Sequence, residues 1–136
     1  MELLEYLVNV DDLHGEPFVL APLGDIQWDG TTVSTSVNQA KAHIARCLNM
    51  NAKFIGMGDY TDFMSPSNRQ RLSGAALYDT AQNVIDAAGE SLVDGVLKEL
   101  LAPTVGQWIG MLEGHHFLQF QTGITSDQLL CQHLKT

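Results

Sequence analysis

Short apolar runs alternate with stripes of apolar residues at helical spacing, and this alternation predicts an α/β fold. Three runs are short enough to be buried strands, and they span residues 17–23, 54–57 and 108–112. Glycine and a polar residue follow each run, directly after the first two and after Glu113 in the third. One helical stripe covers residues 37–49, after a sequence with capping-box spacing. A second stripe covers residues 77–100, interrupted by Gly89 and stopped at Pro103.

The remaining segments predict a loop and a last helix. Residues 63–74 are rich in proline and serine, which favours a loop. A short helix is expected after a cap at Thr125 or Ser126, with three leucines turned inward: Leu129, Leu130 and Leu134. The order strand, helix, strand over residues 17–57 is typical of a right-handed crossover between parallel strands. We therefore expect one domain over residues 1–136, with a mainly parallel sheet flanked by helices in three layers.

The predicted strand ends carry the residues with candidate chemistry. Parallel strands end at the same edge of a sheet, and open α/β sheets bind their ligands there. Asp25 and Asp59 each follow a glycine at such an end, so the two side chains are expected to converge. For either aspartate alone a simple turn is the alternative, because Asp and Gly are common turn residues.

Charge and apolar content limit the classes of partner. Seven Lys and Arg residues stand against sixteen Asp and Glu, a net charge of −9 that opposes binding to long nucleic acid unless metal ions compensate. A protein partner with a basic surface suits this charge. No apolar run approaches the roughly 18 residues of a membrane span, and the acidic first residues predict no signal peptide. Cys47 and Cys131 have no paired spacing, so we expect reduced thiols and a cytoplasmic location.

Three motifs occur in order at the strand ends: Asp-x-Gln at 25–27, Gly-Asp-x-x-Asp at 58–62 and Gly-His-His at 114–116. In this order they resemble the motifs of the calcineurin-like metallophosphoesterases. The stretches SPSNRQRLSGAALYD and PTVGQWIGMLEGHHF are similar to a phage and prokaryotic branch of that family. The resemblance runs from about Phe18 onward and implies a truncated domain of this hydrolase family, equivalent to the first half of its double-sheet α/β sandwich.

The resemblance implies a set of metal ligands. Asp25 would bind one ion, Asp59 would bridge two ions, and His115 would take the place of the Asn that binds the second. Gln27 stands where a histidine ligand is usual, and its amide oxygen is a weaker ligand than imidazole. Mixed carboxylate and imidazole ligands suit manganese, iron or zinc.

The resemblance also implies residues that act on the substrate. His116 matches the histidine that assists phosphoryl chemistry, by stabilising charge or by protonating the leaving oxygen. Arg69 or Arg71 could reach a substrate phosphate from the predicted loop, although a solvated pair of loop cations is the common alternative. Asp62 receives no role from the family pattern.

The chain departs from the family after the third motif. The family has further histidines that complete both metal shells, whereas here His133 is the only histidine after His116 and CQHLKT matches none of those motifs. Because tight binding generally needs about three or four protein ligands, we expect an incomplete dinuclear site, with one ion held weakly. Whether the chain is an active enzyme on its own is left open by this count.

Several residues near the motifs have simpler explanations. His115 and His116 could form a polar turn after a strand. Trp28 and Tyr60 could stack on a nucleobase, but aromatic residues near strand ends more often pack in the core. No role is assigned to three isolated histidines: His14, His43 and His133.

Two classes of function fit these observations. The first is a metal-dependent phosphoesterase that hydrolyses phosphodiesters or nucleotides, with its missing ligands supplied by a complementing chain. The second is a catalytically inactive, truncated phosphoesterase that acts as a phage-encoded binding or inhibitor protein on a basic partner. A sheet that lacks its second layer would expose an apolar face, which a homo-oligomer or a complementing chain would cover in either case.

Overall fold

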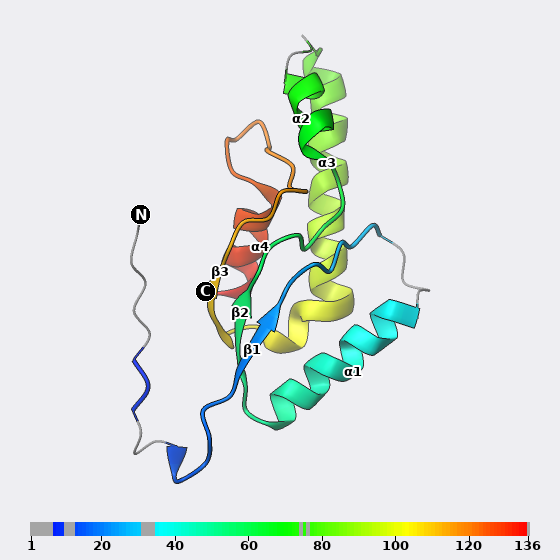
Figure 1. Ribbon diagram of the computed structural model, residues 1–136. Coiled ribbons are helices and arrows are strands. Elements are labelled where there is room, and N and C mark those ends of the chain that lie inside the picture. Colours follow the sequence, from blue (N-terminus) through cyan, green and yellow to red (C-terminus); the bar gives the residue numbers. More distant parts are fainter. Residues whose placement is uncertain (1–6, 10–12, 31–34, 74, 76, 136) are drawn as a thin grey trace.

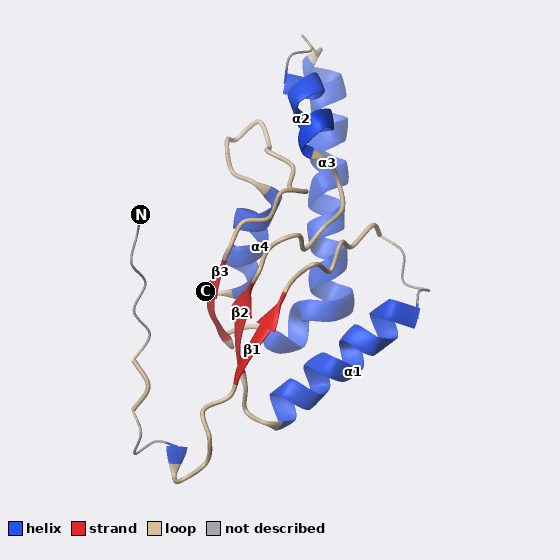
Figure 2. Cartoon of the chain, viewed as in Figure 1, coloured by secondary structure: helices blue, strands red, loops and turns tan. Residues whose placement is uncertain are grey.

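The computed structural model describes residues 7–9, 13–30, 35–73, 75 and 77–135. Its centre is an open sheet of parallel strands in the order β1-β2-β3, which Figure 2 shows side by side. The strands are β1 (Leu20–Leu23), β2 (Lys53–Gly56) and β3 (Trp108–Met111). These elements, with the four helices described next, confirm the predicted α/β class and the predicted strand positions.

Among the described residues, four α-helices accompany the sheet: α1 (Thr35–Asn49), α2 (Pro66–Ser73), α3 (Asp79–Val96) and α4 (Ser126–Leu134). Helix α3 continues through a π-helical stretch, Leu97–Leu101, into a short 3-10 turn, Ala102–Thr104. The expected cap of α4 is confirmed at Thr125, which forms a capping box with Gln128. None of the helices in the described part of the chain is long and apolar enough to cross a membrane.

Two local predictions were wrong. Most of the expected loop over 63–74 is the helix α2, because Ser65 accepts a hydrogen bond from the Asn68 amide at its start and Pro66 suits the first helical position; Gly74 lies outside the described residues. The expected interruption at Gly89 is also absent from the structure. Gly89 is buried within α3 beside Leu118, where its lack of a side chain allows close packing.

The helices share a single core with one face of the sheet. Side chains from all three strands are buried there, against residues of α1, α3 and α4; the strand members include Ala21, Phe54 and Trp108. Figure 1 shows α3 and α4 behind the sheet and α1 at its side. Two right-handed crossovers that advance in the same direction place their helices on the same face. The described part of the chain therefore forms two layers, which corrects the expected three.

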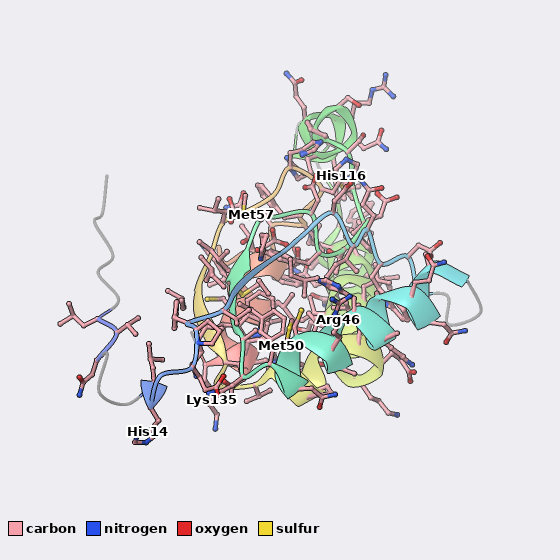
Figure 3. The ribbon with its side chains drawn as sticks, turned by 60° about the horizontal axis from the view of Figure 1, so that its bottom comes forward. His14, Arg46, Met50, Met57, His116 and Lys135 are labelled. Atoms are coloured by element: carbon pink, nitrogen blue, oxygen red, sulfur yellow. The ribbon has the colours of Figure 1, made fainter. Side chains whose placement is uncertain are left out.

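The opposite face of the sheet is exposed and apolar. Alternation along β1 and β2 turns Leu20 and Met57 away from the helices; Met57 is labelled in Figure 3. An irregularity in the register between β2 and β3 turns Met111 to the core after Trp108, so that Leu112 lies on the same face as Met57. These three side chains, Leu20, Met57 and Leu112, are 48%, 54% and 57% exposed. The carboxyl ends of the strands lie at one edge, because both strand pairs are parallel. That edge brings the three motifs together.

Candidate metal centre

Two glycines allow the second and third motifs to touch. Gly58 follows β2 with a positive φ of 91°, and a side-chain carbon at this position would lie 2.8 Å from the Cα of Gly114. A side-chain carbon on Gly114 would overlap the backbone and the carboxylate of Asp59. The close approach of the two loops therefore requires glycine at both positions.

Asp59 is the centre of the contact between these loops. Its Oδ1 accepts hydrogen bonds from the backbone amides of His115, at 2.6 Å, and His116, at 3.2 Å. Its Oδ2 lies 2.8 Å from His115 Nδ1. The Asp59 side chain is only 13% exposed, whereas that of His115 is 66% exposed. The carboxylate is thus fixed at the base of the site, with an imidazole above it that solvent can reach.

Asp62 holds the second imidazole. His116 Nδ1 lies 2.9 Å from Asp62 Oδ1, and the rings of His115 and His116 meet edge to face with centroids 4.5 Å apart. A carboxylate that accepts a proton from Nδ1 leaves Nε2 with its lone pair free for a metal ion or a proton. Both imidazoles have this arrangement. The only sequence signal for the Asp62 contact was its spacing of three residues from Asp59.

The described residues contain one group of side chains that could hold a metal ion. Asp59, His115 and His116 each offer a ligand atom, and these atoms all lie within 4.8 Å of one another. One carboxylate and two imidazoles form a donor set that suits zinc, iron or manganese. The residues present therefore fit a single divalent ion of this class.

The first motif lies beside this group but does not join it. The Asp25 amide donates to the Gly58 carbonyl at 3.0 Å, and the Gln27 amide donates to the Asp59 carbonyl at 2.9 Å. The backbones of the two loops thus converge as expected. The side chains of Asp25 and Gln27 hydrogen-bond to each other at 2.9 Å, and neither belongs to the group formed by Asp59 and the two histidines.

The two arginines from the predicted loop have different surroundings on α2. Arg69 Nη1 donates to the carbonyl oxygens of Met64, His115 and Phe117, and the guanidinium stacks on the Phe117 ring at 4.0 Å from its centroid. Arg71 is exposed in the last turn of the same helix. Arg69 therefore contacts the segment that carries the histidines through the backbone carbonyl oxygens of that segment.

Sequence reasoning missed Asp127, a buried carboxylate behind the histidine segment. Asp127 Oδ2 accepts a hydrogen bond from the Gly114 amide at 2.9 Å. Burial raises the pKa of Asp127 above its usual value, and the negative charges of Glu113 and Asp59 add to this rise. An aspartate in the first turn of a helix is ordinarily explained by the helix dipole alone, so its position gave no signal of this contact.

The aromatic residues next to the motifs pack in the core. Trp28 and Tyr60 are both buried, which confirms the packing explanation over a nucleobase platform. The Tyr60 hydroxyl accepts from the Gly58 amide at 3.1 Å and donates to the Leu112 carbonyl at 2.9 Å, so it joins the ends of β2 and β3. Burial raises the pKa of Tyr60 to about 12.

No family model matches the chain, and neither a curated protein nor a solved structure matches it. The resemblance to the calcineurin-like metallophosphoesterases therefore stays a prediction that rests on the order of the three motifs.

Proposed function

We propose that this chain is a metal-dependent phosphoesterase-like protein that acts on phosphodiesters or nucleotides. Asp59, His115 and His116 would hold one divalent ion, either manganese, iron or zinc, at the carboxyl edge of the sheet. One observation carries the proposal: a carboxylate and two imidazoles from two separate strand ends have ligand atoms within 4.8 Å of one another. The reaction class, hydrolysis of phosphate esters, is proposed from the order of the three motifs along the chain.

The residues of the chain support the chemistry in distinct ways. A bound divalent ion would polarise a phosphate oxygen and lower the pKa of a coordinated water. Asp62 orients His116 through Nδ1, which leaves Nε2 to bind the ion or to exchange a proton with the leaving oxygen. Asp25 and Gln27 remain proposed ligands of a second, weaker ion, because their loop is hydrogen-bonded to the loop of Asp59.

The first test is a calorimetric titration of the purified chain with Mn²⁺. Asp59→Asn keeps the shape of the side chain and removes its charge, so we expect its affinity to fall by more than about tenfold. Glu90→Gln is the matched control, because Glu90 is an exposed acid on α3 and its loss changes the net charge by the same amount. Equal affinities in the parent and in Asp59→Asn would show that the ion binds only to diffuse negative charge.

The second test measures the hydrolytic activity of the chain. Hydrolysis of bis-p-nitrophenyl phosphate should require added Mn²⁺ and should be lost in Asp59→Asn. His116→Gln should lower the rate with a smaller effect on Mn²⁺ affinity if His116 mainly moves the proton. Metal binding without hydrolysis of this diester would contradict phosphodiesterase activity of the chain on its own and would leave the site as a binding site.

A second candidate function is a catalytically inactive binding protein for a basic partner. The exposed apolar face at Leu20, Met57 and Leu112 favours it, together with the net charge of −9. In this case neither the parent nor Asp59→Asn hydrolyses phosphodiesters. Sedimentation velocity would test whether the face joins copies of the chain, with Leu112→Glu expected to break the association.

A further inference from the structure

The peptide group between His115 and His116 lies between two opposite charges. Its carbonyl oxygen, on His115, accepts from Arg69 Nη1 at 2.7 Å, and its amide, on His116, donates to Asp59 Oδ1 at 3.2 Å. The dipole of this one peptide group therefore points its negative end at a guanidinium and its positive end at a carboxylate. Hydrogen bonds to charged groups are roughly twice as strong as bonds between neutral groups.

The contact extends to the neighbouring peptide groups. Arg69 Nη1 also donates to the Phe117 carbonyl at 2.9 Å and to the Met64 carbonyl at 3.0 Å. The central carbon of the guanidinium, Cζ, lies over the Phe117 ring, 4.0 Å from its centroid. One side chain from α2 thus fixes the backbone on both sides of His116 and ties it to the segment that follows β2.

We propose that Arg69 is a positioning residue, which fixes the His115–Phe117 backbone so that both imidazoles face Asp59 and Asp62. Nη1 has its donors directed at backbone carbonyls, so this nitrogen acts on the backbone of the histidine segment. The functional meaning of this inference rests on the proposed metal site. The geometry itself needs no bound ion, so it can be tested separately.

The metal-free test is amide hydrogen exchange measured by NMR. In Arg69→Gln, the amides of His115 and His116 should exchange at least about tenfold faster than in the parent, because the guanidinium no longer holds their segment against Asp59. Arg71→Gln is the matched control on the same helix and should exchange like the parent. Amides in α3 should keep their protection in both variants, which shows that the fold is intact.

A conservative variant covers the case in which Arg69→Gln does not fold. Arg69→Lys keeps the positive charge but loses the planar stack on Phe117, so exchange at His115 and His116 should be faster than in the parent. It should be slower than in Arg69→Gln if that variant folds. Parent-like exchange at these two amides in an Arg69 variant would overturn the proposal.

The metal titration separates positioning from contact with the substrate. With no phosphate present, Arg69→Gln should bind Mn²⁺ about tenfold or more weakly than Arg71→Gln, because residues that orient metal ligands have effects of this size. An arginine that only contacts phosphate would leave Mn²⁺ affinity unchanged and raise KM, and this result would also overturn the proposal. If the parent binds none of Mn²⁺, Fe²⁺ and Zn²⁺, the proposed function fails, and the exchange measurement still decides the role of Arg69.

Discussion

The Tyr60 hydroxyl is one of the contacts that hold the Gly58-Asp59 loop. It accepts from the Gly58 amide at 3.1 Å and donates to the Leu112 carbonyl at 2.9 Å. Tyr60→Phe removes the oxygen and keeps the ring, which is fully buried. The substitution therefore isolates the two hydrogen bonds from the packing of the aromatic side chain.

The structure sets the size of the expected effect. Gly58 is buried, so its amide would lose its partner in a place that water does not readily reach, at a cost of about 1–3 kcal/mol. Leu112 is 57% exposed, so water can replace the hydroxyl at its carbonyl, and this bond adds little. We expect the free energy of unfolding of Tyr60→Phe to fall by about 1–3 kcal/mol in total.

Urea unfolding at pH 7 gives the difference directly. Tyr78→Phe is the matched control, because Tyr78 is 86% exposed and its hydroxyl is expected to contribute almost nothing. The same free energy of unfolding in Tyr60→Phe and Tyr78→Phe would refute the claim that the Tyr60 hydroxyl joins the two strand ends.

The pH dependence provides an independent check of the same contact. Burial raises the pKa of Tyr60 to about 12 in the folded chain from 10.0. The folded state thus binds the phenol proton more tightly than the unfolded state. The resulting stability is complete below pH 10 and is lost as the pH rises towards 12. Tyr60→Phe should lack this loss, and an absorbance titration of the folded protein should show one tyrosine that ionises near pH 12.

Three further predictions follow from close packing and burial. Gly114→Ala places a methyl group against Asp59, so Mn²⁺ affinity should fall by about tenfold or more in calorimetry. Gly89→Ala puts a carbon 2.5 Å from Leu118 Cδ2; urea unfolding should show a loss of about 1–3 kcal/mol, because overpacking outweighs the gain in helix propensity. Burial raises the pKa of Asp127 above 3.8, so its contribution to the free energy of unfolding declines as the pH rises through and above that value. Asp127→Asn should weaken this decline in urea unfolding between pH 4 and 7, and should be at least as stable as the parent at pH 7.

The positions of the strands could be predicted because each strand is a short apolar run that is followed within three residues by glycine. The predicted run 108–112 and the observed β3, Trp108–Met111, differ by one residue. The helix between the first two runs predicted that β1 and β2 are parallel. Parallel strands place their carboxyl ends at the same edge of the sheet. The convergence of the Asp25 and Asp59 loops could be expected from these facts alone, whereas the contact of Asp59 with the histidine segment also depends on the position of β3 beside β2.

Helix α2 could not be predicted from apolar periodicity because it has almost no apolar face. Its sequence, PSNRQRLS, is polar throughout apart from one leucine. The helix is held by contacts with distant parts of the chain, above all those of Arg69 with the His115–Phe117 segment, 46 to 48 residues away. Such contacts leave no local pattern, so both the helix and the role of its arginine required the structure.

The number of layers follows from the order of the strands in the sheet. Right-handed crossovers place helices on opposite faces only when the strand order reverses, and the order β1-β2-β3 does not reverse. The long helical run to Leu101 therefore joins α1 on one face. The apolar residues at Leu20 and Met57, which a second helical layer would have buried, are exposed.

The hydrogen bonds of Asp59 favour one metal ion per chain over two. A carboxylate oxygen has two lone pairs, and Oδ1 already accepts two backbone amides, from His115 and His116. Only Oδ2 remains for an ion, and it also faces His115 Nδ1 at 2.8 Å. A bridge between two ions would require Oδ1 to release an amide that helps to hold the histidine segment in place. Loss of that amide would loosen the two imidazoles, so binding of a second ion at Asp25 would oppose binding of the first.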